Sequence, residues 1–155
     1  MNKVGSAKFS FLYESVEKGK DKGRYTFCGY GALSVITNKK SGLYVTKNKK
    51  TKKIKSTKNI LNQINSIISK YKIKNIQNLP PMTSSFFGYL SYENINNIEN
   101  IIKKKKIDTL DIPDCLLFIP ETLIIYDNQK SILFITKTIN KNISNRRTNY
   151  EKIIN

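Results

Sequence analysis

Three aspartates spaced three residues apart come nearest to a metal site in this sequence. Asp108, Asp111 and Asp114 bracket Pro113, and carboxylate oxygens are the ligands that a hard cation such as calcium prefers. A calcium-binding loop also needs a glycine at its sharp turn and a closing glutamate, and this segment has neither in place. We therefore interpret the three aspartates as turn and capping residues.

Other side chains suited to catalysis are sparse. The chain has no histidine, so it lacks the side chain best suited to proton transfer near neutral pH and the commonest imidazole metal ligand. Cys28 and Cys115 form no CxxC pair and are predicted to be small apolar residues. Neither a glycine-rich phosphate loop nor a GxSxG motif is present. These observations disfavour a self-contained enzyme.

The charge of the chain would suit a polyanion ligand, but its composition offers another explanation. The formal net charge is +17, from 28 Lys+Arg and 11 Asp+Glu, a balance typical of proteins that bind nucleic acids or anionic membranes. Arginine occurs only at 24, 146 and 147, whereas bidentate recognition of phosphate and guanine favours arginine over lysine. Lysine, asparagine and isoleucine share A/T-rich codons, so we favour a genomic bias and expect no specific nucleic-acid partner.

Length and hydropathy are typical of one soluble domain. The chain has 155 residues, of which 39% are hydrophobic, enough for one buried core. Positions 1–15 contain no apolar run suited to a signal peptide, and the longest run elsewhere, Cys115–Ile119, is too short to span a bilayer. We expect a cytoplasmic protein without a membrane partner.

The first third of the chain predicts antiparallel strands. Phe9–Val16 and Arg24–Tyr30 are rich in aromatic and aliphatic residues on either side of a polar, glycine-containing stretch, which is typical of a hairpin. Ala32–Thr37 and Leu43–Thr46 predict two further short strands. Lys47–Lys53 is interpreted as a solvated, lysine-rich turn.

Helical periodicity is clearest in the middle of the sequence. Ser56 and Thr57 can cap a helix, whose apolar stripe has three- and four-residue spacing and consists of Ile60, Ile64, Ile67, Ile68 and Tyr71. Asn94–Lys106 allows a second amphipathic helix. Thr148–Asn155 starts a stripe with Tyr150, Ile153 and Ile154 and is predicted to begin a third.

The remaining segments predict strands. Phe86–Tyr92 is an aromatic strand in which Gly88 lets another group approach closely. Cys115–Asp127 is expected to be one long strand, followed by a turn through Asp127–Lys130 and a return strand over Ser131–Thr138. The expected fold is α+β, made mainly of antiparallel sheet with one clear amphipathic helix.

Three ordered motifs carry a resemblance to a known family. They lie in Ser10–Glu17 (SFLYESVE) with Gly23–Gly29 (GRYTFCG), in Phe87–Glu93 (FGYLSYE), and in Leu110–Asp114 (LDIPD) with the later Pro120-Glu121 and Tyr126-Asp127. They are similar to SFLLESVE with GRYSFIG, to VGYLGYD, and to LDLPD with PE and FD. The chain thus resembles the N-terminal domain of chorismate-utilising synthases, in particular of the large subunit of anthranilate synthase, and the same fold is expected.

The resemblance implies an allosteric pocket for L-tryptophan formed by Tyr13, Glu14 and Ser15, with Arg24 on the facing strand. A bound amino acid needs acceptors for its ammonium and a cation or donors for its carboxylate, and these side chains supply both. Strand alternation puts Glu14 on the face opposite Tyr13 and Ser15, so one ligand can reach all three only if a bulge or strand end lies near Glu14. The alternative is a simple Glu14–Arg24 pair across the hairpin.

Two departures from the family pattern bear on this pocket. Tyr13 stands where leucine is usual, which could reshape the pocket, and Ser84-Ser85 replace a glycine pair. We expect weak tryptophan binding by the chain alone, because the resemblance implies that half of the pocket belongs to a catalytic domain.

The resemblance also implies a division of labour within a larger enzyme. Residues 1–147 would be the regulatory domain, and 148–155 the start of an interdomain linker helix, truncated before the catalytic domain. The parent lyase would convert chorismate and glutamine to anthranilate, pyruvate and glutamate under tryptophan feedback inhibition, with a glutamine amidotransferase subunit as partner. Magnesium would belong to the catalytic domain, so no cofactor and no catalytic residue is expected in this chain.

Three alternatives stay open at this stage. The first is the corresponding domain of aminodeoxychorismate synthase on the folate route, which shares the fold. The second is a lysine-rich nucleic-acid-binding module, with Tyr25, Phe27, Phe86 and Tyr89 as stacking platforms, although aromatic residues on strands more often belong to a core. The third is a truncated gene product without an independent role.

Overall fold

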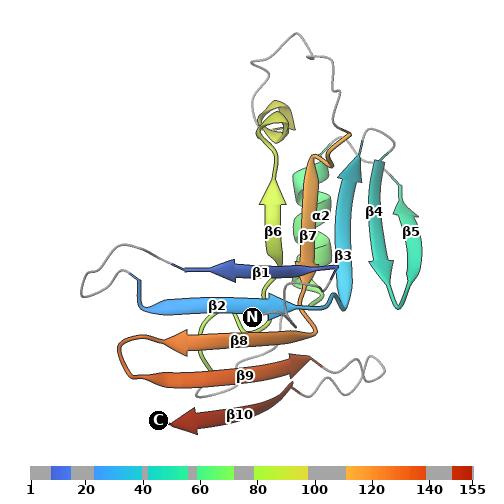
Figure 1. The fold of residues 1–155 in the computed structure, drawn as a ribbon. Helices are drawn as coiled ribbons and strands as arrows, with labels where there is room; N and C mark the ends of the chain where they lie inside the picture. The colour runs from blue at the N-terminus through green and yellow to red at the C-terminus, as the bar shows by residue number, and fades with distance from the viewer. Residues whose placement is uncertain are drawn as a thin grey trace. The chain divides into compact units, whose positions relative to one another are not determined.

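The computed structural model of the chain describes residues 8–14, 23–39, 42–55, 59–71, 79–97, 111–138 and 148–154. These residues form two compact units, each built on a five-stranded sheet in which every pairing is antiparallel (Figure 1). One α-helix and one 3-10 helix complete the described elements. The expected α+β class, with mainly antiparallel sheet and one clear helix, is confirmed.

The first unit contains a sheet of strand order β1-β2-β8-β9-β10. Its strands are β1 (Ser10–Tyr13), β2 (Tyr25–Tyr30), β8 (Thr122–Asp127), β9 (Ile132–Thr138) and β10 (Thr148–Ile154). The expected first hairpin is confirmed, because β1 pairs with β2 in a register that sets Tyr13 opposite Phe27. Strand β2 then pairs with β8, whose last residue, Asp127, lies opposite Tyr25.

One face of this first sheet carries its buried core. Leu123, Ile125 and Phe134 are buried, and the register places them on the same side of β8 and β9. Thr136 is buried among them, and its hydroxyl donates a hydrogen bond to the Leu123 carbonyl at 3.1 Å. This bond satisfies the one polar side chain of the set, so burial leaves no orphaned donor there.

The second unit contains a sheet of order β5-β4-β3-β7-β6 with the helix α2 on one face. Its strands are β3 (Ser34–Lys39), β4 (Gly42–Lys47), β5 (Lys50–Ile54), β6 (Phe87–Leu90) and β7 (Cys115–Ile119). The core joins the buried Ile64 of α2 to Ile36, Leu43 and Cys115 of the sheet. The predicted stripe is confirmed within the helix, since Ile60, Ile67 and Ile68 pack against the same core.

The helix α2 begins later than the sequence suggested. It spans Ile60–Ser69 and is capped by Asn59, whose side-chain oxygen accepts a hydrogen bond from the Asn62 N–H at 3.0 Å. Asparagine is among the strongest N-cap residues, because its carbonyl satisfies one of the free N–H groups of the first turn. The expected caps, Ser56 and Thr57, lie outside the described residues.

Gly88 allows the close approach that was predicted for it. A side chain at this position in β6 would collide with the main-chain carbonyl of Leu116 in the neighbouring β7. The φ angle of Gly88 is +143°, a conformation that residues with a Cβ rarely adopt. Both constraints explain why glycine interrupts an otherwise aromatic strand.

Two expectations about strands and turns were wrong. Only Asn48 and Lys49 form the turn expected over Lys47–Lys53, with φ of 50° and 62°, and β5 then pairs with β4 along the sheet edge. Such a two-residue turn suits a tight hairpin, and lysines are well tolerated on an edge strand. The long strand expected over Cys115–Asp127 is two strands in two sheets, because Pro120 has no N–H to offer a continuous ladder.

The segment Thr148–Ile154 is a strand rather than the predicted start of a helix. It forms β10 and pairs with β9 from Thr148 opposite Thr138 to Ile154 opposite Ile132. Main-chain hydrogen bonds along the edge of β9 outweigh a helical stripe of barely two turns, because so short a helix is marginal without a packing partner. Of the other expected helix, Asn94–Lys106, the first residues belong to the 3-10 helix η1 (Tyr92–Asn97), and positions 98–106 lie outside the described residues.

Candidate functional site

The strand end that the predicted pocket requires lies next to Glu14. Strand β1 ends at Tyr13, so the alternation of a regular strand no longer fixes the direction of the next residues. Tyr13 is 43% exposed and Glu14 is exposed. Ser15 lies outside the described residues.

Aromatic side chains gather on one face of the β1/β2 hairpin. The rings of Phe11 and Tyr13 on β1 are 4.9 Å apart between centroids, and those of Tyr25 and Phe27 on β2 are 6.1 Å apart. The register sets Tyr13 opposite Phe27 and Phe11 opposite a glycine. Opposite residues of an antiparallel pair point to the same side, so these rings lie on the side of the sheet that also carries the buried Leu123 and Ile125. We call these four side chains the aromatic face.

Gly29 makes room for this arrangement. It is the residue opposite Phe11, and a side chain added to it would overlap the Phe11 ring. The absence of a Cβ therefore lets this ring lie across the neighbouring strand, in contact with the backbone of β2.

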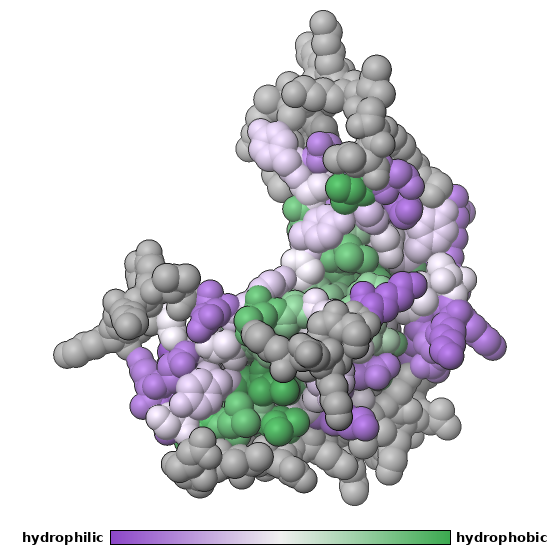
Figure 2. Space-filling view, viewed as in Figure 1, coloured by the Kyte–Doolittle hydropathy of each residue, from purple (hydrophilic) through white to green (hydrophobic). Residues whose placement is uncertain are grey.

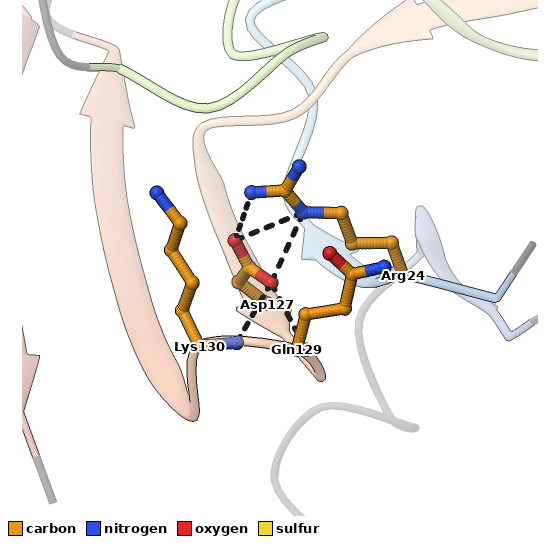
Figure 3. A network of polar contacts seen from close by, with 4 residues as sticks. All are labelled: Arg24, Asp127, Gln129 and Lys130. Carbon is orange, nitrogen blue, oxygen red and sulfur yellow. Dashed lines mark hydrogen bonds and ion pairs between the residues drawn. The ribbon is translucent and has the colours of Figure 1, made fainter. Parts of the chain in front are cut away.

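Arg24, immediately before β2, forms a two-pronged ion pair with Asp127 at the end of β8 (Figure 3). Its Nη2 donates to Asp127 Oδ2 at 2.9 Å, and its Nε lies 3.2 Å from both carboxylate oxygens. The Asp127 side chain is only 3% exposed, whereas that of Arg24 is 33% exposed. A fork of charge-assisted hydrogen bonds fixes the guanidinium plane more tightly than a single contact would.

The turn after β8 supplies Asp127 with further donors. Its Oδ1 accepts hydrogen bonds from the backbone N–H groups of Gln129 at 3.1 Å and Lys130 at 3.2 Å. The hydrogen bonds from Arg24, followed by those from the backbone, lower the pKa of the Asp127 carboxyl below its ordinary value. The same pairing raises the pKa of the Arg24 guanidinium, so both groups stay ionised.

Asn128 ties the beginning of β2 to the same turn. Its backbone N–H donates to the Arg24 carbonyl at 2.7 Å, and its side-chain amide donates to the Gly23 carbonyl at 3.0 Å. In Figure 2, hydrophilic residues gather at the end of this sheet where β2 begins, beside hydrophobic residues over its middle. The ion pair therefore lies in a polar strand end held by main-chain contacts.

The guanidinium adjoins the aromatic face. Its central carbon lies 4.8 Å from the centroid of the Tyr25 ring, a distance within the range of a cation–π contact. An apolar and aromatic surface that ends in an ordered cation has the chemistry to receive a flat ring attached to a carboxylate.

The structure brings Arg24 to a different carboxylate from the one considered. The guanidinium pairs with Asp127, so the simple pairing of Arg24 with Glu14 is not the arrangement found. Sequence reasoning missed Asp127 as a site residue, although it belongs to the third motif. The signal that could have found it is an aspartate that closes a predicted strand immediately before a turn, where its side chain can accept hydrogen bonds from the backbone N–H groups that follow, as in an Asx turn.

Two of the three aspartates considered for a metal site make separate structural contacts. Asp111 lies 3.5 Å from Lys39 in an exposed ion pair, and the backbone of Asp114 bonds to Asn38 and Ser91, while Asp108 lies outside the described residues. Within the described ranges, no group of three or more candidate ligands could hold a metal ion. Their expected turn role agrees with the φ of +47° at Asp111.

The two cysteines differ in burial. Cys115 is fully buried, and burial raises the pKa of its thiol to about 12, so it is unreactive as a nucleophile. Cys28 is half-buried, and both cysteines are free.

In the part of the chain that the structure describes, no helix has the length and apolar character to cross a membrane.

The aromatic residues imagined as nucleic-acid platforms are divided between the two units. Tyr25 and Phe27 belong to the first sheet. Phe86 packs edge-on against Tyr71 in the second unit, at 5.3 Å between centroids, while Tyr89 is exposed. The packing of Phe86 fits the interpretation as core.

No protein-family model and no curated protein sequence matches this chain.

Proposed function

We propose that this chain is the tryptophan-binding regulatory domain of a chorismate-utilising synthase, namely the large subunit of anthranilate synthase, with the fold of that domain. The support is the order of the three motifs along the sequence, together with the position of the first motif in a hairpin. Residues of the first motif, Tyr13 and Glu14, lie at the end of β1, and Arg24 immediately precedes the strand paired with it.

The observation that carries the proposal is the junction of the aromatic face with the Arg24 guanidinium. Tryptophan has an indole ring, which packs well on aromatic side chains, and a carboxylate, which suits a guanidinium. Glu14 offers a carboxylate for the ammonium group. Tyr13, with its exposed ring, would contact the indole.

The rest of the parent enzyme belongs to the same proposal. A cytoplasmic catalytic domain would bind chorismate and magnesium, and a glutamine amidotransferase subunit would deliver ammonia. Tryptophan would bind an inactive conformation of the assembly more tightly than the active one, and its binding would therefore lower the synthase activity.

A titration of the isotope-labelled chain with L-tryptophan, followed by NMR, tests the proposal. We expect saturable shifts of backbone signals in β1 and β2, at millimolar or lower ligand concentration, and much smaller shifts with L-alanine. The absence of saturable shifts at any concentration up to the solubility of tryptophan would contradict the proposal.

Two tyrosine variants sharpen the titration. Tyr13→Ala should weaken tryptophan binding about fivefold, because an aromatic contact of this kind contributes on the order of 1 kcal/mol. Tyr92→Ala is the matched control, since Tyr92 is 72% exposed and belongs to η1 in the other unit. Equal effects of the two substitutions would show that the shifts do not report binding at the hairpin.

A further inference from the structure

We propose that Asp127 is a positioning residue of the tryptophan site, which holds the Arg24 guanidinium so that its Nη1 edge receives the ligand carboxylate. This inference rests on the proposed function and adds to it a residue from outside the first motif. Three observations carry it: the fork between the two side chains, the burial of Asp127, and the contact of Arg24 with Tyr25.

The fork determines which hydrogens of Arg24 remain for a ligand. A guanidinium is planar and has five N–H bonds in fixed directions. Asp127 occupies the edge formed by Nε and Nη2. The edge formed by Nη1 and the outer hydrogen of Nη2 points away from Asp127, and it has the geometry to bind a second carboxylate through two parallel hydrogen bonds.

The surroundings of Asp127 keep this orientation fixed. Its side chain is almost fully buried, and the N–H groups of Gln129 and Lys130 hold Oδ1 from the turn. The negative charge of Asp127 is therefore shared among backbone donors as well as the guanidinium. The turn donors offset part of the carboxylate charge that faces Arg24, and the ligand need not order a freely rotating side chain on binding.

The third observation is the position of the guanidinium beside the aromatic face. The guanidinium lies against the Tyr25 ring, which is next to Phe27 on the aromatic face. A ligand whose ring packs on the aromatic face can therefore reach Arg24 with a carboxylate on a short linker. Tryptophan has this layout, whereas tryptamine has the same ring and ammonium but no carboxylate.

The test compares tryptophan with tryptamine in binding to the full chain and to Asp127→Asn, by calorimetry or NMR titration. Asparagine can still accept the turn hydrogen bonds through Oδ1, but it does not form the charged fork. We expect the preference of the wild type for tryptophan over tryptamine to fall about tenfold or more in the variant, with tryptamine binding unchanged. Asp111→Asn, which alters net charge equally at an exposed pair, should keep the wild-type preference.

Each outcome decides a different question. If the wild type binds no tryptophan, the proposed function and this inference both fail. If the wild type binds and Asp127→Asn keeps its preference, or loses affinity equally for both ligands, Asp127 has only a structural role and the inference alone fails.

A second variant covers the case in which Asp127→Asn does not fold. Arg24→Lys retains a cation beside Asp127 but cannot present two parallel N–H groups. We expect it to lose the same preference for the carboxylate while still binding tryptamine. A wild-type preference in Arg24→Lys would overturn the inference.

Discussion

Two carboxylates of this chain pair with cations in opposite surroundings. Asp127 is 3% exposed and meets Arg24 through a fork with one contact of 2.9 Å, whereas Asp111 is 83% exposed and lies 3.5 Å from Lys39. The first pair joins strand ends far apart in sequence and is surrounded by turn donors. The second lies at the surface, where both side chains are exposed to solvent.

The difference shows that the contribution of an ion pair to stability depends more on its surroundings than on its two charges. An exposed pair is screened by water and salt, and fixing two long side chains costs entropy. A buried carboxylate must keep its partners, because their loss leaves a desolvated charge or unsatisfied donors. Only the Arg24–Asp127 pair therefore has the rigidity that a ligand site needs.

The largest effect is expected from Asp127→Ala. It removes the partner of Arg24 and the acceptor of two turn N–H groups, so we expect a loss of about 2 to 3 kcal/mol in the free energy of unfolding. Urea denaturation followed by circular dichroism measures it. A loss below about 0.5 kcal/mol, the level of ordinary surface substitutions, would remove the contrast between the two pairs.

Acid should erase the contribution of Asp127. Its pKa is lowered in the folded chain, so the folded state binds fewer protons than the unfolded state. The stabilisation is then fully present above the unfolded pKa of about 3.9 and is lost as pH falls through the folded pKa. The unfolding free energies of the wild type and Asp127→Asn should differ at pH 7 and converge well below pH 4. A constant difference would exclude this linkage.

Two substitutions between arginine and lysine test how much the geometry of each ion pair matters when the charge is unchanged. Arg24→Lys should destabilise the chain less than Asp127→Ala, because Asp127 keeps its hydrogen bonds from the turn. The loss of stability should still be measurable, because lysine cannot form the fork. Lys39→Arg at the exposed pair is the reciprocal control and should leave the urea midpoint unchanged. Equal shifts for the two variants would mean that geometry plays no part in the first pair.

The smallest effect is expected at the exposed pair itself. Asp111→Asn should change the unfolding free energy by no more than about 0.5 kcal/mol, and high salt should remove even that difference. Denaturation at low and high ionic strength checks this expectation. A loss that persists in salt would show that Lys39 and Asp111 contribute more than their exposure allows.

Local patterns predicted the parts of the fold that depend on neighbouring residues. The alternation in Arg24–Tyr30 predicted β2 and its hairpin with β1, because a hairpin brings together strands that follow one another. The isoleucine stripe predicted α2, although Asn59 rather than Ser56 or Thr57 provides the cap. The strand end next to Glu14 was required by alternation and is present.

Pairings between distant segments could not be predicted in this way. Arg24 and Asp127 are separated by 103 residues, and they meet only because β2, which pairs with its sequence neighbour β1 on one side, pairs with the distant β8 on the other. The same limit explains β10, since its helical stripe was visible in the sequence but the available edge of β9 was not. Residue types indicated that Arg24 could bind a ligand carboxylate, but the orientation of the Arg24 guanidinium depends on this long-range pairing.

The most direct test of the account observes the Arg24 side chain itself during tryptophan binding. The chain has only three arginines, at 24, 146 and 147, so arginine-selective nitrogen labelling gives few side-chain NMR signals. We predict that tryptophan, but not tryptamine, shifts the Arg24 Nε and Nη signals with the same saturation as the backbone signals of β1. Saturable backbone shifts with unchanged Arg24 side-chain signals would contradict the claim that this guanidinium binds the ligand carboxylate.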